Sequence, residues 1–260
     1  MGLSEQKKQK VIVVLIRSLR DKFQNYKPET SHMPFHYHLL GKDRMALYSF
    51  IQSINTTFGT SIYEPVAIEL AKGRFSVAKA HVKPNDEISN EAQQVIQNII
   101  DELTSGMRAP DRQKEFQEIK QVCSEMPLKK VKPGLVDIWL EDYHGNIFLF
   151  DLKTVKPNIE GFIGYKRKLL EWIALELVKN PNANINPIIG IPYNPYEPKP
   201  YKRWTMRGMF ELHKEVLIAE ELWDFIGGDG AYHDLLDCFE QAGIELRPEI
   251  DEYFARFRDD

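Results

Sequence analysis

The chain has 260 residues, of which 43% are hydrophobic and 28% charged, an ordinary composition for a globular protein with one large domain or two small ones. Taken as a whole, the formal net charge of −4 argues against a nucleic-acid partner. Cys123 and Cys238 are too far apart in the sequence to suggest a disulfide framework or a zinc module, and no apolar run approaches the ~20 residues that cross a bilayer. These features predict a cytoplasmic protein with no membrane association.

The N-terminal two fifths of the chain are predicted to be helical. Apolar residues recur at helical spacing from Ser4 to about residue 23, and residues 24–40 are expected to form a loop. A second helix is expected to end at Gly59, and a third covers about 61–71. Two more helices are predicted over 88–103 and 111–126.

The pattern changes at Pro133. Residues 135–140 and 146–153 form two strand-like runs joined by a short turn, which indicates a β-hairpin. Both runs are apolar on both faces, as is typical of strands that are covered on both sides. A helix is predicted over 158–178 and a third strand over 185–191, so the middle of the chain is expected to be an α/β domain.

The C-terminal part begins with residues 192–204, which are rich in proline and aromatic residues and are expected to form an extended loop. The remainder is predicted to be mainly helical. Glycines at 227, 228 and 230 precede a helix over 232–242, and a last helix covers 249–257.

The register of the hairpin brings two carboxylates together. If the loop consists of Tyr143, His144 and Gly145, with Gly145 in the left-handed conformation, Asp137 lies directly opposite Asp151. Their Cβ atoms would be about 5 Å apart, and Lys153 would point the same way. A five-residue loop keeps this register, whereas a four-residue loop would break it.

Two facing carboxylates on central strands need compensation, because like charges and buried charges both destabilise a sheet. A hard divalent cation held by Asp137 and Asp151 would supply it, and oxygen ligands favour Mg²⁺ or Mn²⁺ over zinc. Lys153 could then hold or deprotonate a water, as hydrolysis of a phosphodiester requires. The alternative is a simple ion pair between Asp151 and Lys153 on an edge strand.

This order of an Asp, a hairpin, Asp-x-Lys and a helix resembles the core of the PD-(D/E)xK nucleases. The chain also resembles type II restriction endonucleases of the TdeIII group in three stretches, MPFHYHLLGKDRMALYSFIQSINTTFGTSIYEPVA (33–67), GLVDIWLEDYHGNIFLFDLKTVK (134–156) and ELWDFIGG (221–228). The resemblance implies a single domain over 1–260 with a PD-(D/E)xK core, a mixed central sheet flanked by helices, at about 59–191. Helical additions would cover 1–58 and 208–260.

The resemblance also implies an activity and its residues. The chain would be a Mg²⁺-dependent type II restriction endonuclease, for which Mn²⁺ can substitute, and would cut double-stranded DNA at a palindrome of the GGNCC type. Asp137, Asp151 and the carbonyl of Leu152 would hold the metal, and Lys153 would act on the attacking water. The products would carry a 5′-phosphate and a 3′-hydroxyl, and a homodimer and a cognate DNA methyltransferase would be the partners.

A third acid is expected from a preceding helix, and Glu64 is the first candidate. Ser61 and Glu64 also have the spacing of a capping box, so Glu64 could simply mark a helix start. Glu69 and Glu171 are the alternatives for the catalytic role. Glu64 and Glu69 point to different sides of a helix and cannot both reach one site.

The histidines and cysteines carry weaker signals. The spacing of His32, His36 and His38 allows a zinc site, but no fourth ligand is evident, and loop packing or a phosphate contact is the simpler interpretation. Cys123 and Cys238 have no adjacent base and are expected to be ordinary buried thiols.

Basic residues surround the proposed site and are the candidates for DNA contacts, although solvation is the ordinary reason for a charged helix face. Arginine can read guanine through two hydrogen bonds, which favours the segment after the proline-rich loop. The predicted DNA-binding residues are Lys156, Lys166, Arg167, Lys202, Arg203 and Arg207.

The charge of the chain is unevenly distributed. Residues 129–168 contain eight basic and five acidic side chains, and residues 199–214 contain five and one. Residues 215–260 contain three basic and fourteen acidic side chains, so the negative total reflects an acidic C-terminal region. Two other functions remain open from the sequence, a repair or recombination nuclease guided by DNA structure and a DNA-binding module without catalysis.

Overall fold

The computed structural model describes residues 2–27, 33–153, 161–201, 206 and 208–256. The chain divides into two compact units, of which the first comprises residues 1–70 and 228–260 and the second residues 71–227. Among the described residues, no helix combines the length and apolar character needed to cross a membrane.

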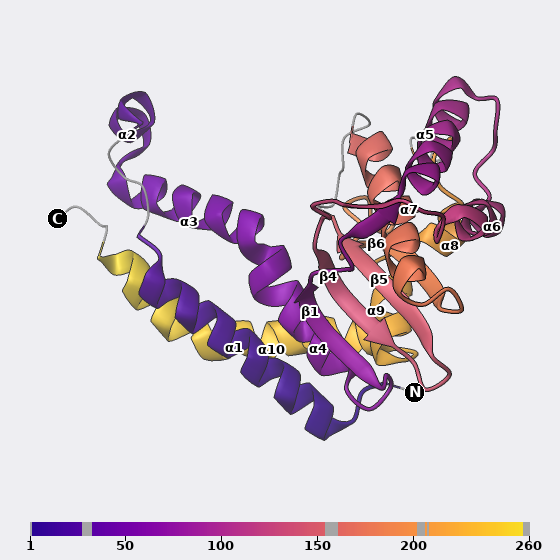
Figure 1. Ribbon diagram of the computed structural model, residues 1–260. Helices are drawn as coiled ribbons and strands as arrows, with labels where there is room; N and C mark the ends of the chain where they lie inside the picture. Colours follow the sequence, from indigo (N-terminus) through magenta and orange to yellow (C-terminus); the bar gives the residue numbers. More distant parts are fainter. Residues whose placement is uncertain (1, 28–32, 154–160, 202–205, 207, 257–260) are drawn as a thin grey trace. The chain divides into compact units, whose positions relative to one another are not determined.

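The first unit is helical. Its elements are α1 (Glu5–Asn25), α2 (Pro34–Leu40), α3 (Lys42–Phe58), the π-helical turn η1 (Gly59–Tyr63), α4 (Glu64–Ala71) and α10 (Ala231–Ala255). Figure 1 shows α1 beside α10. The two helices run parallel, because Lys8 pairs with Asp234 near their starts and Arg20 pairs with Glu249 further along. The expected start of α1 is confirmed, since the Ser4 side chain accepts a hydrogen bond from the N–H of Lys7.

Three expectations for this unit are wrong. Residues 34–40 form α2 rather than a loop, and Pro34 suits its first turn because proline has no N–H to leave unpaired there. Gly59 ends α3 as expected, but the chain stays helical through η1 into α4, so Ser61 and Glu64 cap no helix start. The two predicted C-terminal helices form the single helix α10, with Pro248 inside it.

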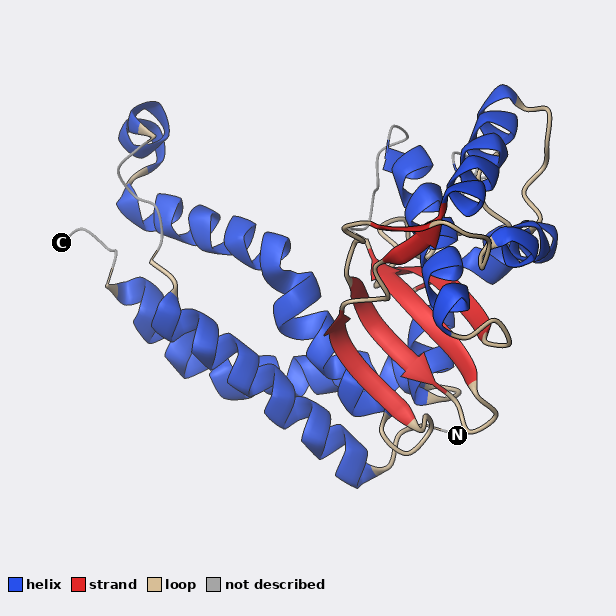
Figure 2. Cartoon of the chain, viewed as in Figure 1, coloured by secondary structure: helices blue, strands red, loops and turns tan. Residues whose placement is uncertain are grey.

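The second unit contains a five-stranded mixed sheet with helices around it (Figure 2). The strand order is β1-β4-β5-β6-β7, in which β1, β4 and β5 are antiparallel and β5, β6 and β7 are parallel. These strands are β1 (Val77–Val82), β4 (Val136–Glu141), β5 (Asn146–Leu152), β6 (Asn184–Ile191) and β7 (Val216–Ile218). The expected α/β class and mixed sheet are therefore confirmed.

The remaining elements of the second unit surround this sheet. A separate two-stranded sheet pairs β2 (Glu87–Ser89) with β3 (Leu128–Lys130). The helices are α5 (Asn90–Ser105), α6 (Arg112–Val122), α7 (Gly161–Lys179), α8 (Leu212–Glu215) and α9 (Glu220–Gly227). The sequence patterns predicted neither β1, β2, β3 nor β7, and β7 extends the sheet beyond residue 191, the expected end of the core.

Different helices cover the two faces of strand β5. On one face, the rings of Phe148 and Phe150 lie 5.0 and 5.8 Å from that of Phe225 in α9. Asp151 points to the other face, because side chains alternate along a strand, and there it meets Lys168 of α7. Phe150 and Asp151 are both fully buried, which confirms that this strand is covered on both sides.

Candidate active site

The hairpin has the expected register. Four residue pairs from Ile138 with Phe150 to Glu141 with Ile147 align β4 and β5, and the next step of this ladder sets Asp137 opposite Asp151. The turn closes through a 3.0 Å hydrogen bond from the N–H of Asp142 to the carbonyl of Asn146. Gly145 has φ = 80°, a left-handed conformation that costs glycine little.

Asp137 is held near the start of β4. Its Oδ2 accepts a 2.7 Å hydrogen bond from the backbone N–H of Leu152 across the hairpin. Burial raises the pKa of Asp137, and the negative charge of Asp151 raises it further. Lys168, the N–H of Leu152 and Lys153 act in the opposite direction by stabilising the ionised form.

Asp151 is fully buried and is contacted by two ammonium groups. The Nζ of Lys153 lies 2.7 Å from its Oδ2, and the Nζ of Lys168 lies 2.6 Å from its Oδ1. The Asp151–Lys153 ion pair therefore exists, but on a central strand between β4 and β6 and not on an edge strand. Two carboxylates and two lysines thus form one compact, electrically balanced cluster.

Two further residues, Lys168 and His81, were given no role in the site from the sequence alone. Lys168 stands in a basic stretch of α7, and the sequence does not show which side of the helix faces the site. Only the packing of α7 on the sheet directs the Lys168 side chain to Asp151. His81 lies between Ala80 and Val82, which pair with Ile138 and Val136, and so stands level with Asp137 on the neighbouring strand. Its φ of 52° is unusual for a residue other than glycine.

The donor chemistry suits a hard divalent cation. Mg²⁺ in proteins commonly takes one or two carboxylates and completes its shell with waters and substrate phosphates. Asp137 and Asp151, with the carbonyl of Leu152, offer such a set. In the part of the chain that the structure describes, no three or more His, Cys, Asp and Glu side chains gather as a metal site.

The candidate third acids lie on different elements. Glu64 and Glu69 belong to α4 and are both buried, with 1% and 6% of their surface exposed. Glu171 lies on α7, one turn after Lys168, and burial raises its pKa against the opposing effect of Arg167. The choice among the three acids remains a prediction.

The expected DNA contact by Lys166 conflicts with its burial. Its side chain is 0% exposed, and its Nζ lies 2.6 Å from both Glu115 Oε2 and Glu215 Oε1. The ammonium is not accessible to a phosphate and instead forms ion pairs with two buried carboxylates. Arg167 is half-buried and donates a 2.7 Å hydrogen bond to Gln97.

Other predicted DNA contacts fall on residues that the structure does not describe, namely Lys156, Lys202, Arg203 and Arg207. His32 is also outside the described residues. His36 and His38 lie on the exposed helix α2, where residues two positions apart point to nearly opposite sides and cannot share a metal. Cys123 and Cys238 are free and buried, as expected, and burial raises the pKa of the Cys238 thiol to about 11.

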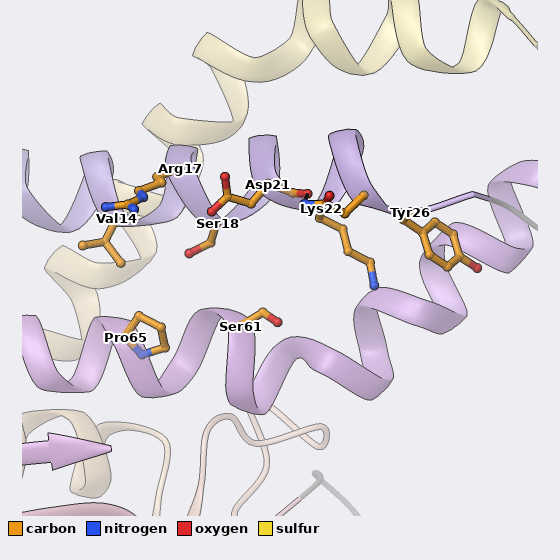
Figure 3. Close-up of a pocket in the computed structure, with 9 residues that line it drawn as sticks. Val14, Arg17, Ser18, Asp21, Lys22, Tyr26, Ser61 and Pro65 are labelled. Atoms are coloured by element: carbon orange, nitrogen blue, oxygen red, sulfur yellow. Dashed lines mark hydrogen bonds between the residues drawn. The ribbon is translucent and has the colours of Figure 1, made fainter. Parts of the chain in front are cut away.

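A groove of about 610 Å³ lies in the first unit (Figure 3). Its walls come from α1 and from the segment around Ser61 and Pro65, and Figure 3 shows the Lys22 side chain between the two. None of the lining residues belongs to the carboxylate–lysine cluster, so this groove and the candidate active site are separate features.

Comparison with known proteins gives a consistent result. The family model described as "Type II restriction endonuclease, HinfI" matches residues 3–243. The type II restriction enzyme MjaII of Methanocaldococcus jannaschii is 31% identical over an alignment of 285 positions, which covers 98% of this chain and 74% of that protein. HgiEI of Herpetosiphon aurantiacus, also a type II restriction enzyme, is 23% identical over 93% of this chain and 90% of its own length. The chain therefore belongs to the HinfI family of type II restriction endonucleases and is a site-specific endonuclease.

Proposed function

We propose that this chain is a Mg²⁺-dependent nuclease of the PD-(D/E)xK type that cuts double-stranded DNA at a short GC-rich palindrome. The supporting observation is the pairing of Asp137 with Asp151 across the hairpin, with Lys153 2.7 Å from Asp151. The GGNCC type of site and membership of the TdeIII group rest on the sequence resemblance. A cognate DNA methyltransferase would protect the host's own sites.

Each residue of the cluster has a role in this proposal. Asp137, Asp151 and the carbonyl of Leu152 would hold the cation, which supplies Lewis acidity toward the phosphate and lowers the pKa of a bound water. Lys153 would orient the attacking water as an ammonium group, or would take its proton in the neutral amine form. The water oxygen would bond to phosphorus in line with the breaking P–O3′ bond, and the leaving O3′ would take up a proton, giving a 5′-phosphate and a 3′-hydroxyl.

The test is cleavage of plasmid DNA with Mg²⁺ or Mn²⁺ present. The wild type should give fragments whose sequenced ends all lie at one short palindrome. Asp137→Asn and Lys153→Ala should each lower the cleavage rate by about 10²-fold or more, the usual cost of removing one group that acts on the transition state. Scattered ends would contradict sequence-specific cutting, and a Lys153→Ala variant as active as the wild type would contradict the mechanism.

A palindromic target favours a homodimer. The DNA site has two-fold symmetry, so each of two copies of the chain can cut one strand. An exposed apolar face in the first unit supports this proposal. Helix α2 buries no residue, and it exposes 87% of Phe35 and 82% of Leu39. Leu47, Tyr48 and Ile51 of the following helix α3 are each about half exposed.

These side chains expose on the order of 500 Å², more than half of what a standard interface buries on each partner, so a second copy is the proposed occupant. The measurement is molecular mass in solution by light scattering. The wild type should have the mass of a dimer, and Phe35→Ser with Leu39→Ser should have that of a monomer. Met107→Ser, at a methionine of the second unit that is 78% exposed, is the control and should remain dimeric. A monomeric wild type would contradict the proposal, and a dimeric double variant would place the interface elsewhere.

A further inference from the structure

The buried carboxylate of Asp151 is shared by two lysines. Lys153 approaches Oδ2 from the end of the same strand, and Lys168 approaches Oδ1 from α7, at 2.7 and 2.6 Å. Each lysine side chain is about one quarter exposed, whereas Asp151 has no exposed surface. The mechanism proposed above uses Lys153 and assigns no task to Lys168.

The surroundings of Lys168 guide its side chain to Asp151. Its ammonium lies 4.8 Å from the ring centre of Trp172, and the indole N–H of Trp172 donates a 3.0 Å hydrogen bond to the carbonyl of Gly134. A Cβ atom on Gly134 would stand 2.8 Å from Cε of Lys168. The Lys168 side chain therefore passes directly over the backbone of Gly134, just before β4. A larger residue at position 134 would leave less room for this side chain.

A cation that binds Asp151 must compete with these ammonium groups, because an ammonium nitrogen lies within 2.7 Å of each carboxylate oxygen. Asp137 and Asp151 carry two negative charges, and Lys153 and Lys168 carry two positive ones. The cluster is neutral in this state and would gain two positive charges with a divalent cation. A positive site attracts the phosphate backbone of DNA, so cation binding and phosphate binding would support each other.

We propose that Lys168 is a second active-site lysine: it neutralises Asp151 until a divalent cation binds, and it then moves its ammonium group to a phosphate oxygen of the bound DNA. This inference rests on the proposed function. Lys153 is tied to β5 and β6, where its own N–H donates a 2.9 Å hydrogen bond to the carbonyl of Gly190. Lys168 reaches Asp151 from a different element, α7, and in this proposal it is the lysine that contacts the substrate.

The experiment compares the wild type with Lys168→Met and with Lys179→Met, a control at an exposed lysine of the same helix. Calorimetric titration with Ca²⁺, which takes similar oxygen ligands, measures cation binding without DNA. Loss of the competing ammonium should tighten Ca²⁺ binding about tenfold in Lys168→Met, the order of one charge-assisted hydrogen bond. Lys179→Met should bind Ca²⁺ like the wild type.

Two further measurements use a short duplex that contains the mapped cut site. Ca²⁺ should strengthen DNA binding by the wild type, and this gain should be about tenfold smaller in Lys168→Met. With Mg²⁺, its cleavage rate should fall about 10²-fold. Lys168→Gln provides a second neutral variant with the same expectations, and thermal unfolding shows whether each variant is folded.

The outcomes separate this inference from the proposed function. If the wild type cuts DNA and both neutral variants bind Ca²⁺ and cut like Lys179→Met, the role of Lys168 is refuted and the proposed function stands. If Ca²⁺ binds the neutral variants more weakly than the wild type, Lys168 is a support of the cation site and not its competitor, which also refutes the inference. If the wild type neither binds a divalent cation nor cuts DNA, the proposed function itself fails.

Discussion

Replacement of Lys166 by methionine tests the interpretation that this lysine is structural. Methionine keeps most of the volume of the lysine stem and removes only the charge. The side chain of Lys166 is 0% exposed, and those of Glu115 and Glu215 are 1% and 2% exposed. Both carboxylates would lose an ammonium at 2.6 Å and remain buried.

The magnitude follows from the burial of all three groups. Removing one partner of a buried ion pair leaves an uncompensated charge and typically costs about 3–5 kcal/mol. Burial already raises the pKa of Glu115, so one carboxylate can escape part of this cost by taking up a proton. Arg112 provides a second positive charge near Glu215, which reduces the loss further. We therefore expect a loss of about 3 kcal/mol, the lower end of this range.

The assay is urea unfolding at pH 7, with the melting temperature as a second readout. A loss of about 3 kcal/mol lowers the melting temperature of a protein of this size by roughly 6–12 °C. Lys179→Met is the matched control, because Lys179 is exposed on the same helix, and it should change stability by less than about 0.5 kcal/mol. Lys166→Met with Glu115→Gln should recover part of the loss.

DNA binding supplies the result that would refute this reasoning. A lysine that contacts a phosphate contributes about one unit to the dependence of binding on salt concentration. If Lys166→Met unfolds like the wild type and the salt dependence of DNA binding falls by about one unit, Lys166 is a DNA contact. Unchanged salt dependence with lowered stability is the outcome that the buried ion pairs predict.

Two more predictions concern backbone packing and pH. In Gly190→Ala the new Cβ would stand 2.8 Å from Cδ2 of Leu152 and 3.2 Å from Cδ1 of Leu222, so we expect urea unfolding to show a loss of stability of about 1–2 kcal/mol. The control is Gly164→Ala on α7, which has open space around the new Cβ and should be neutral or stabilising. Equal stability of the two variants would contradict the packing argument. The hydrogen bond from Lys8 lowers the pKa of Asp234 below its ordinary value of 3.8, so the stability contributed by this carboxylate is present above about pH 4 and is lost as the pH falls further. Asp234→Asn should therefore be less stable than the wild type at pH 7 and approach it in acid, and a difference that stays constant across a pH series of thermal melts would refute this assignment.

The sequence by itself determined the hairpin and its pair of carboxylates. Runs that are apolar on both faces define both strands, and Gly145 fixes the turn, so the register that sets Asp137 opposite Asp151 depends only on neighbouring residues. The resemblance to restriction endonucleases was equally readable, and the family match over residues 3–243 confirms that level of the assignment. Helices with strong local signals, such as α1 with its Ser4 cap, were predicted for the same reason.

Only the tertiary structure decided the outer strands of the sheet and the carboxylates that the lysines of α7 contact. The strands β1 and β7 were not predicted from their own residues, and they form because a neighbouring strand offers its unpaired backbone groups. Lys166 and Lys168 stand two residues apart on α7, yet one is buried between Glu115 and Glu215 and the other reaches Asp151. A basic stretch in a sequence has no orientation. The packing of the helix against the sheet supplies the orientation. Because burying an unpaired charge is costly, each lysine can be buried only where it forms an ion pair with carboxylates.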